Sequence, residues 1–208
     1  GVLQDPTVPT TLAFVQLDEH GDRSFSFYRD PGADIMLRTE EVSAELISDC
    51  RIFHFGSVSL TAEPCRSATL NAAASAKAAG ALISYDPNYR PLLWDNETHA
   101  AAEMKAAIFL SDVLKVSEEE MHLLTGETSL TEGAKKLAAM GPTAVLITLG
   151  ARGAFYYTEH QSGLLPTYDV KTIDTTGAGD AFLGALLWCL RGKSAQQLAQ
   201  LSGAEWNA

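Results

Sequence analysis

The chain has 208 residues, of which 46% are apolar and 20% are charged, so it can bury the core of one domain and is not a disordered sequence. Its formal net charge of −11 excludes an electrostatic attraction to nucleic acid or to an anionic membrane surface. The longest apolar run, residues 181–190, has about half the length of a membrane span, so we expect neither nucleic acid nor a membrane as a partner.

The first predicted element is a β-hairpin. Residues 11–17 (TLAFVQL) and 23–29 (RSFSFYR) have the composition of strands, and Phe25 and Phe27 alternate with polar residues in the second of them. The segment between the two strands, DEHGD, is polar and contains a glycine, which favours a tight connection. A turn-rich stretch, DPGAD, follows the second strand.

The middle of the chain alternates between short apolar strands and helices. After a helix at residues 39–47, we predict strands at 51–55, 81–87, 112–117 and 143–150, and helices at 64–79, 99–110, 118–124 and 131–140. This alternation is typical of βαβ units with right-handed crossovers, in which helices cover both faces of a mostly parallel sheet. The predicted fold class is therefore α/β.

The pattern changes after Gly150. Two further strands, at residues 153–159 and 164–170, are separated by a short polar segment and are expected to pair antiparallel. A glycine-rich segment, a long apolar helix at residues 180–190 and another helix from about residue 194 complete the chain. We find no internal repeat and no linker that would divide the chain.

The cysteines and the start of the chain indicate a cellular location. Cys50, Cys65 and Cys189 form no CxxC pair and have no histidine at zinc-finger spacing, which is typical of reduced, mostly buried thiols in a cytosolic protein. Residues 1–10 lack the regions of a signal peptide. We expect a cytoplasmic location, and a plastid location is also compatible because a plastid form would have lost its transit peptide.

The segment DTTGAGDAF, residues 174–182, carries the strongest chemical signal. It lies between a predicted strand and a predicted helix, and Gly177 and Gly179 allow a tight turn. The backbone N–H groups of Gly177, Ala178 and Gly179 at the helix start would form an anion site. Asp180 in the first helical turn suits a general base that takes a proton from an attacking hydroxyl. The alternative is a glycine-rich turn in which Asp180 only caps the helix.

The complete string, followed by Gly-Ala-Leu-Leu, resembles the nucleotide-side signature of the ribokinase-like (PfkB-type) carbohydrate kinases. The strings FYRDPGAD, EPCRSATL and DPNYRPLLW are similar to fructokinases in particular. The resemblance implies a three-layer α/β/α domain with a small β-sheet lid over the sugar site. Residues 1–34 would then be the lid strands and the segment after them. Residues 35–208 would be the truncated α/β domain that binds nucleotide and phosphate.

The resemblance also assigns residues to the sugar and phosphate side. Arg29 would lie near the sugar, and the alternative is an exposed lid arginine paired with Asp30 or Asp34. In DPNYR, Arg90 would bind two phosphate oxygens with its guanidinium group. Asp86 and Asn88 would contact sugar, phosphate or a hydrated metal ion. The alternative for this segment is an Asx-type turn with a surface arginine.

Three further segments resemble parts of the family's ATP and metal site. KVSEEEMHLLTG matches an element whose usual form is Asn-x-x-Glu, with Ser117 in place of the asparagine, and Glu120 would organise Mg²⁺ through water. The alternative is a solvated acidic helix start. ITLGARGAFYY resembles the nucleotide loop, so Thr148, Gly150 and Gly153 would line ATP, unless they only form a strand end and its turn. GAEWNA resembles the helix beside adenine, with Asn207 as the family's asparagine.

The predicted function is ATP-dependent phosphorylation of the primary hydroxyl of a keto-sugar, most simply D-fructose to fructose 6-phosphate, with Mg²⁺. The alternatives are a kinase for 2-keto-3-deoxygluconate, ribose or a nucleoside, and a non-catalytic fructokinase-like structural partner. The family's first strand, its sugar-site asparagine signature and its C-terminal strands have no counterpart here, so we expect an incomplete kinase with an exposed sheet edge. The apolar lid residues Phe14, Phe25 and Phe27 are compatible with a homodimer through the lid.

Overall fold

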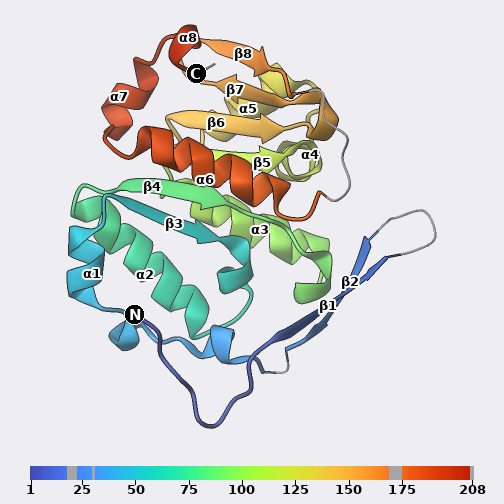
Figure 1. Cartoon of the computed structure of the whole chain (residues 1–208), viewed down its shortest axis with the longest axis vertical. Helices are drawn as coiled ribbons and strands as arrows, with labels where there is room; N and C mark the ends of the chain where they lie inside the picture. Colours follow the sequence, from blue (N-terminus) through green and yellow to red (C-terminus); the bar gives the residue numbers. More distant parts are fainter. Residues whose placement is uncertain (18–22, 30, 169–174, 207–208) are drawn as a thin grey trace.

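The structure, a computed structural model, describes residues 1–17, 23–29, 31–168 and 175–206 (Figure 1). Its centre is a six-stranded sheet in the order β3-β4-β5-β6-β7-β8. Strands β3 to β6 are parallel, and β7 and β8 are antiparallel additions at one edge. The strands are β3 Ile52–Gly56, β4 Leu82–Asp86, β5 Val113–Ser117, β6 Ala144–Thr148, β7 Ala154–Tyr157 and β8 Ser162–Leu165.

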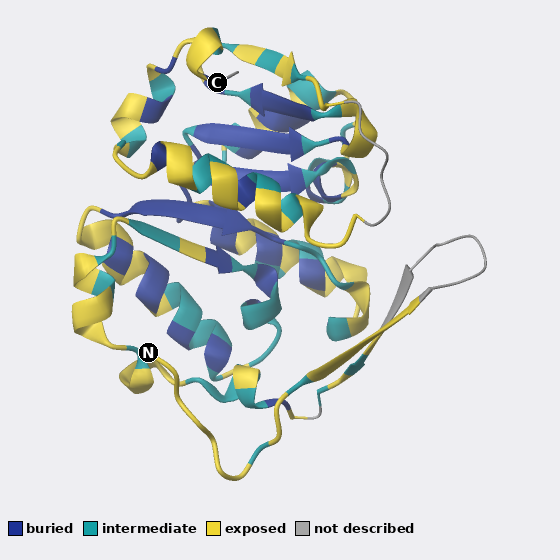
Figure 2. Cartoon of the chain, in the orientation of Figure 1, coloured by how far each residue is buried: buried dark blue, intermediate teal, exposed yellow. Residues whose placement is uncertain are grey.

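Helices cover both faces of this sheet (Figures 1 and 2). One face packs against α2 Cys65–Ala78, α3 Glu97–Ile108, α4 Glu118–Thr125 and α5 Leu130–Ala138, and the other against α6 Ala178–Leu190, α7 Ala195–Ala199 and α8 Gly203–Trp206. Successive strand residues point to opposite faces, so Ile83 and Leu114 enter the first core while Leu82 and Val113 enter the second. The predicted three-layer α/β/α fold with a mostly parallel sheet is confirmed.

A separate two-stranded antiparallel sheet extends from the α/β body (Figure 1). It consists of β1 Leu12–Leu17 and β2 Arg23–Tyr28, and Leu12 pairs with Tyr28. The predicted strand pair is confirmed, whereas its connecting turn lies outside the described residues. Phe14 is exposed, as the lid interpretation expects, and the side chain of Phe25 is not described. The domain boundary at residue 34 stays a prediction.

Two predicted elements were wrong in their bounds. The helix predicted at residues 39–47 is split into a 3₁₀ turn, η2 Thr39–Glu41, and a short helix, α1 Ala44–Asp49. Ser43 separates them because its hydroxyl accepts the N–H of Leu46 and so caps a new helix. The strand predicted at residues 164–170 instead spans Ser162–Leu165, where Pro166, which lacks an N–H, follows the strand.

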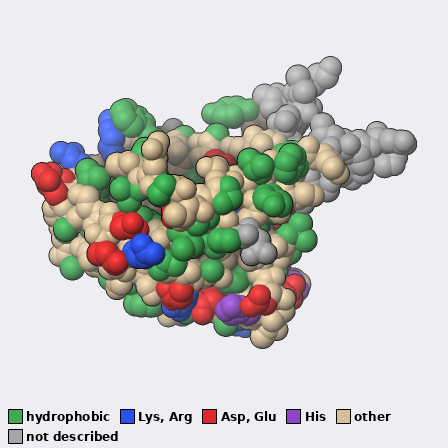
Figure 3. Space-filling view, turned by 90° about the horizontal axis from the view of Figure 1, so that it is seen from below, with side chains coloured by type: hydrophobic (Ala, Val, Ile, Leu, Met, Phe, Trp, Pro, Cys, Tyr) green, Lys and Arg blue, Asp and Glu red, His purple; other side chains and the backbone are tan. Residues whose placement is uncertain are grey.

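Short 3₁₀ turns form the remaining connections, namely η1 Ala33–Met36, η3 Ser57–Leu60, η4 Pro91–Leu93 and η5 Gly150–Arg152. The three cysteines are free thiols, but only Cys65 is buried. The expectation of mostly buried thiols is wrong for Cys189, because it lies on the outward face of α6. Seen from below, the surface carries several groups of apolar side chains with carboxylates between them (Figure 3).

Candidate active site

The first turn of α6 has the geometry predicted for Gly177, whereas the prediction for Gly179 is wrong, because Gly179 lies inside the helix without a positive φ. Gly177 has a φ of +74°, in the left-handed region, and precedes the helix as its N-cap. Asp180 lies in the first turn and is exposed, so its carboxylate is accessible from solvent. The N–H of Ala178 donates to the carbonyl of Thr175 at 3.1 Å. To bind an anion, the N–H of Ala178 would therefore have to break its hydrogen bond to the carbonyl of Thr175.

A row of polar side chains crosses the sheet beneath this turn. Because side chains alternate along each strand, His54, Ser84, Asp86 and Lys115 lie on the face that α6 covers. His54 Nδ1 lies 3.1 Å from Ser84 Oγ, and Lys115 Nζ donates to Asp86 Oδ2 at 2.8 Å. Asp86 is 3% exposed and Lys115 is 7% exposed, so this ion pair is buried.

One member of the row, Lys115, lies directly against the predicted anion turn. A Cβ placed on Gly179 would lie 3.2 Å from Lys115 Nζ, so a side chain at this position would press on the ammonium group. Burial lowers the pKa of His54 from its ordinary value of 6.5, while the negative charges of Asp86 and Asp180 oppose that shift. His54 is thus neutral at pH 7 and lies within the electrostatic reach of both carboxylates.

The segment after β4 forms the turn that was the alternative interpretation of DPNYR. The N–H of Asn88 donates to Asp86 Oδ1 at 3.1 Å, and Asn88 has a φ of +49°. Arg90 donates to the carbonyl of Tyr89 at 3.1 Å. Arg90 nevertheless lines a cavity of about 700 Å³ together with Asn88, Lys115 and Glu120. The structure therefore brings together the residues predicted for phosphate and metal, with Asp86 beneath them.

Glu120 has a structural role at the start of α4. Its Oε2 accepts the N–H of Ser117 at 2.7 Å, and Ser117 Oγ accepts the N–H of Glu120 at 3.1 Å, which together form a capping box. Its Oε1 accepts the N–H of Tyr89 at 2.6 Å, which ties α4 to the turn after β4. Burial raises the pKa of Glu120 despite these bonds, so the interpretation as a solvated helix start is wrong for this residue.

Each carboxylate oxygen of Glu120 accepts one backbone N–H, and an ionised carboxylate offers about four acceptor sites, so lone pairs remain for further contacts. The carboxylate borders the cavity, so its chemistry suits a water-mediated contact to Mg²⁺. Among the described residues, no group of three or more His, Cys, Asp or Glu side chains is arranged to hold a metal ion directly.

The predicted nucleotide loop connects β6 to β7. Thr148 ends β6 beside Ser117 of β5, so both lie at the same edge of the sheet. Gly153 has a φ of +94°, and a Cβ there would collide with the carbonyl oxygen of Leu165. Gly150 has a φ of +59° with open space around it. Both glycines are needed by the turn itself, and Asn207 lies outside the described residues.

Arg29 connects the small sheet to the large one. Its guanidinium group donates to Asp34 Oδ2 at 2.8 Å, to Thr61 Oγ1 at 2.9 Å and to the carbonyl of Val58 at 3.2 Å. The side chain is 7% exposed, so the alternative of an exposed lid arginine is wrong, although Asp34 is its partner. Val58 and Thr61 follow β3, which places Arg29 on the side of the molecule where the parallel strands end (Figure 1).

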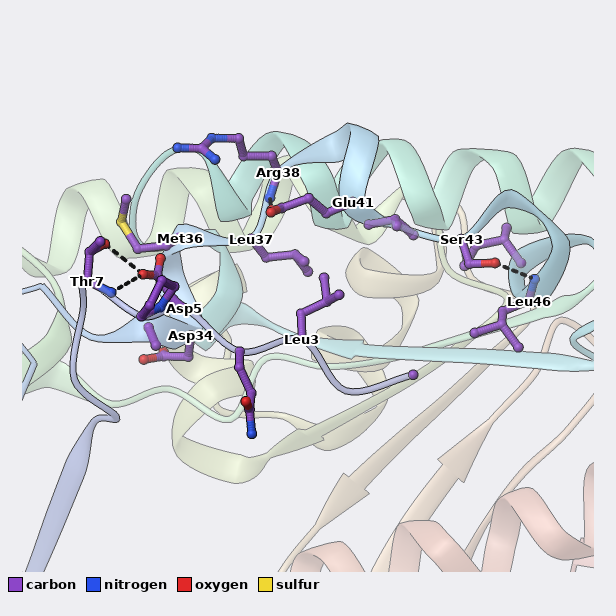
Figure 4. A pocket seen from close by; sticks show the side chains of 16 residues that line it. Leu3, Asp5, Thr7, Asp34, Met36, Leu37, Arg38, Glu41, Ser43 and Leu46 are labelled. Atoms are coloured by element: carbon purple, nitrogen blue, oxygen red, sulfur yellow. Dashed lines mark hydrogen bonds between the residues drawn. The ribbon is translucent and has the colours of Figure 1, made fainter.

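A second cavity lies elsewhere. It has a volume of about 760 Å³ and lies between residues 1–7 and the segment from η1 to α1, and Figure 4 shows its lining. Its polar groups are satisfied locally: Thr7 donates to Asp5, Arg38 to Glu41 and Leu46 to Ser43. None of the predicted site residues lines it, so we assign the site to the carboxyl edge of the sheet.

Comparison with known proteins identifies the family of this chain. The profile described as pfkB family carbohydrate kinase matches residues 1–204. The chain belongs to this family. Within the family it is 47% identical over 188 residues to "Fructokinase-1" of Oryza sativa subsp. japonica and 46% identical to "Fructokinase-1" of Zea mays, covering 90% of this chain and 58% of each relative. The predicted resemblance to PfkB-type fructokinases is confirmed.

Solved structures of pfkB-family fructokinases also superpose well. An ATP-bound fructokinase from Xylella fastidiosa gives a TM-score of 0.85 at 36% identity, covering 94% of this chain and 62% of that one. A fructokinase from Vibrio cholerae O395 with fructose, ADP and calcium gives 0.81 at 40% identity, covering 90% and 60%. The chain thus spans less than two thirds of each relative. In the part that the structure describes, no helix has the length and apolar character needed to span a bilayer.

Sequence reasoning missed Lys115, His54 and Ser84. The available signal was a polar residue at the third position of each of three mostly apolar strand segments, IFHFG, LISYD and VLKVS, where the side chains share one face of the sheet. That signal is weak in any one strand, and only the register between strands brings the three residues to one place.

Proposed function

We propose that the protein containing this chain is an ATP-dependent fructokinase that phosphorylates the primary hydroxyl of D-fructose to give fructose 6-phosphate. The observation that carries the proposal is an exposed Asp180 in the first turn of α6, directly after the Gly177–Gly179 turn. Both the curated relatives and the superposed structures are fructokinases, and one of those structures holds fructose and ADP.

Asp180 would take the proton of the sugar hydroxyl as that oxygen attacks phosphorus. Because the side chain is exposed, a sugar hydroxyl can approach it without a rearrangement of the core. The N–H groups of Gly177, Ala178 and Gly179 would bind the charge that develops on the transferred group. Arg29, bonded to the loop after β3, would lie near the sugar.

ATP supplies the phosphoryl group when it is bound, and Mg²⁺ neutralises the phosphate charge. Thr148, Gly150, Gly153 and Asn207 would line the nucleotide. Arg90 would bind phosphate oxygens from the shared cavity, where Asn88 is a further contact. Glu120 would hold a water of Mg²⁺. Asp86 is engaged by Lys115 and by the N–H of Asn88, which favours an indirect role for its carboxylate.

The proposal extends to assembly and location. We propose a homodimer through the small sheet, supported by the exposed Leu12, Phe14 and Val15 of β1. The protein would act in the cytoplasm, with the plastid as the alternative.

A substrate panel tests the proposed function. The intact protein that carries this sequence is incubated with ATP, Mg²⁺ and one acceptor at a time: fructose, ribose, 2-keto-3-deoxygluconate or a nucleoside. We expect ADP release with fructose to exceed that with the other acceptors by at least about tenfold in kcat/KM, with fructose 6-phosphate identified by mass spectrometry. A preference for another acceptor would replace fructose in the proposal, and no ADP release with any acceptor would favour the structural-partner alternative.

A further inference from the structure

The buried ion pair between Lys115 and Asp86 is poorly explained as a source of stability. Burying two charges costs desolvation energy that their attraction offsets only with good geometry and additional hydrogen bonds. Asp86 has such bonds, since Oδ2 accepts from Lys115 and Oδ1 from the N–H of Asn88. The pair sits at the carboxyl end of the strands, directly under the first turn of α6.

The orientation of this pair is specific. Among the described residues, only Lys115 atoms come within 4 Å of a Cβ built on Gly179, with Nζ at 3.2 Å and Cε at 3.8 Å. The ammonium group of the pair therefore lies against the start of α6. A positive charge held there attracts an anion bound at the helix start, and the attraction is stronger where the pair is buried.

Two further contacts support a role of Lys115 at the site. At Gly179 the ammonium group lies next to the helix backbone, and a side chain there would push it back by a few tenths of an ångström. Lys115 also lines the cavity of about 700 Å³ that contains Arg90, so two cationic side chains border the same space. Asp180, the proposed base, follows Gly179 directly, so the ammonium group acts on the turn that would hold the transferred phosphoryl group.

We propose that Lys115 is a positioning residue for phosphoryl transfer: it supplies a fixed positive charge beneath the anion turn, and Asp86 keeps it aimed at Gly179. This inference rests on the proposed kinase function and extends it to a residue on the central strand β5.

The test replaces Lys115 and Asp86 together, so that neither charge is left buried without its partner. Lys115→Met alone leaves Asp86 buried and unpaired, whereas the double variant Lys115→Met/Asp86→Asn is neutral. The matched control is Lys77→Met/Asp112→Asn, a second lysine–aspartate pair whose Nζ and Oδ1 lie 3.1 Å apart at the opposite end of β5. ATP and adenosine binding are measured by calorimetry, and kcat and KM by ADP release, on the intact protein. Thermal unfolding checks that each variant is folded.

We expect the Lys115/Asp86 double variant to bind ATP about tenfold more weakly and adenosine unchanged, since adenosine carries no phosphate. Its kcat should fall about 10²-fold, with the KM for fructose within about threefold of wild type. The Lys77→Met/Asp112→Asn control should stay within about twofold of wild type in its affinity for ATP, its affinity for adenosine, its kcat and its KM for fructose. Lys115→Arg, which keeps the charge, should bind ATP within about threefold of wild type. If the double variant does not fold, the ATP affinities of Lys115→Arg and Lys115→Met are compared instead, and the inference requires that Lys115→Arg binds ATP more tightly.

Two results would overturn the inference. The first is a Lys115/Asp86 double variant that matches the Lys77/Asp112 control. The second is a double variant that recovers the activity lost in Lys115→Met. Activity would then require only that the buried pair has no net charge, and not that position 115 carries a positive charge. If the wild type phosphorylates no acceptor, the proposed function fails, but the ATP and adenosine titrations still test whether Lys115 supports phosphate binding.

Discussion

Polar side chains on the mostly apolar strands β3 to β5 form the base of the candidate site. His54, Ser84, Asp86 and Lys115 would each cost free energy if buried alone, and each is hydrogen-bonded to another member of the row. Glu120 follows the same rule through two backbone N–H groups. The buried polar groups therefore hold the carboxyl ends of β3 to β5 in a fixed arrangement beneath α6.

His54 makes the stability of the protein depend on pH. Burial lowers its pKa below 6.5, so between its folded pKa and 6.5 the unfolded chain binds the proton more readily than the folded one. The contribution of neutral His54 to the free energy of unfolding is therefore fully present above pH 6.5. It is lost as the pH falls through the pKa of His54 in the folded protein. We expect His54→Gln to remove this loss, measured as the free energy of unfolding between pH 5 and 7. A parallel pH dependence in wild type and variant would contradict the assignment.

At the scale of elements, the connections after the strands decide the geometry of the site. The turn after β6 needs Gly153 because the carbonyl oxygen of Leu165 on β8 occupies the space of a side chain. Arg29 likewise joins β2 to η3 through a bond to the Val58 carbonyl. These contacts link segments that are distant in sequence, so the loops at the carboxyl edge are held by the same framework as the strands.

The β6–β7 turn can be tested with two glycines that both have a positive φ, of which only Gly153 has an atom in the space of a Cβ. Gly153→Ala combines a φ of +94° with a collision, and we expect it to lower the free energy of unfolding by about 3–5 kcal/mol. Gly150→Ala has a φ of +59° and open space, so its cost should be about 1–2 kcal/mol. Urea denaturation of both variants measures the difference. Equal costs would show that the contact with Leu165 does not constrain the turn.

Element types were more predictable than their bounds. The alternation of apolar strands and helices predicts β3 to β6 and their order in the chain, because a parallel sheet buries strands on both faces. The split of residues 39–47 depends on a hydrogen bond from Leu46 to Ser43, and the position of β8 depends on pairing with β7. Both are decided by specific contacts that composition and periodicity do not encode.

At the scale of the whole molecule, the candidate site residues gather where the parallel strands end. The start of α6, the turn after β4 and the β6–β7 turn all lie on this side, and the small sheet extends from it (Figure 1). The motif DTTGAGDAF predicts one part of this region, namely Gly177, Gly179 and Asp180. It could not predict that Lys115 lies beneath Gly179, because that contact joins a central strand to a helix more than sixty residues later in the chain.

The central claim is that Asp180 is the base of an ATP-dependent sugar kinase. The most direct measurement compares fructose-dependent ADP release by wild type, Asp180→Asn and, as a control, Asp95→Asn, a carboxylate that is largely exposed beside α3. The account predicts that Asp180→Asn lowers kcat by at least about 10³-fold while the affinity for ATP, measured by calorimetry, stays within about threefold, and that Asp95→Asn behaves as wild type. An Asp180→Asn variant with a kcat within tenfold of wild type would contradict the account.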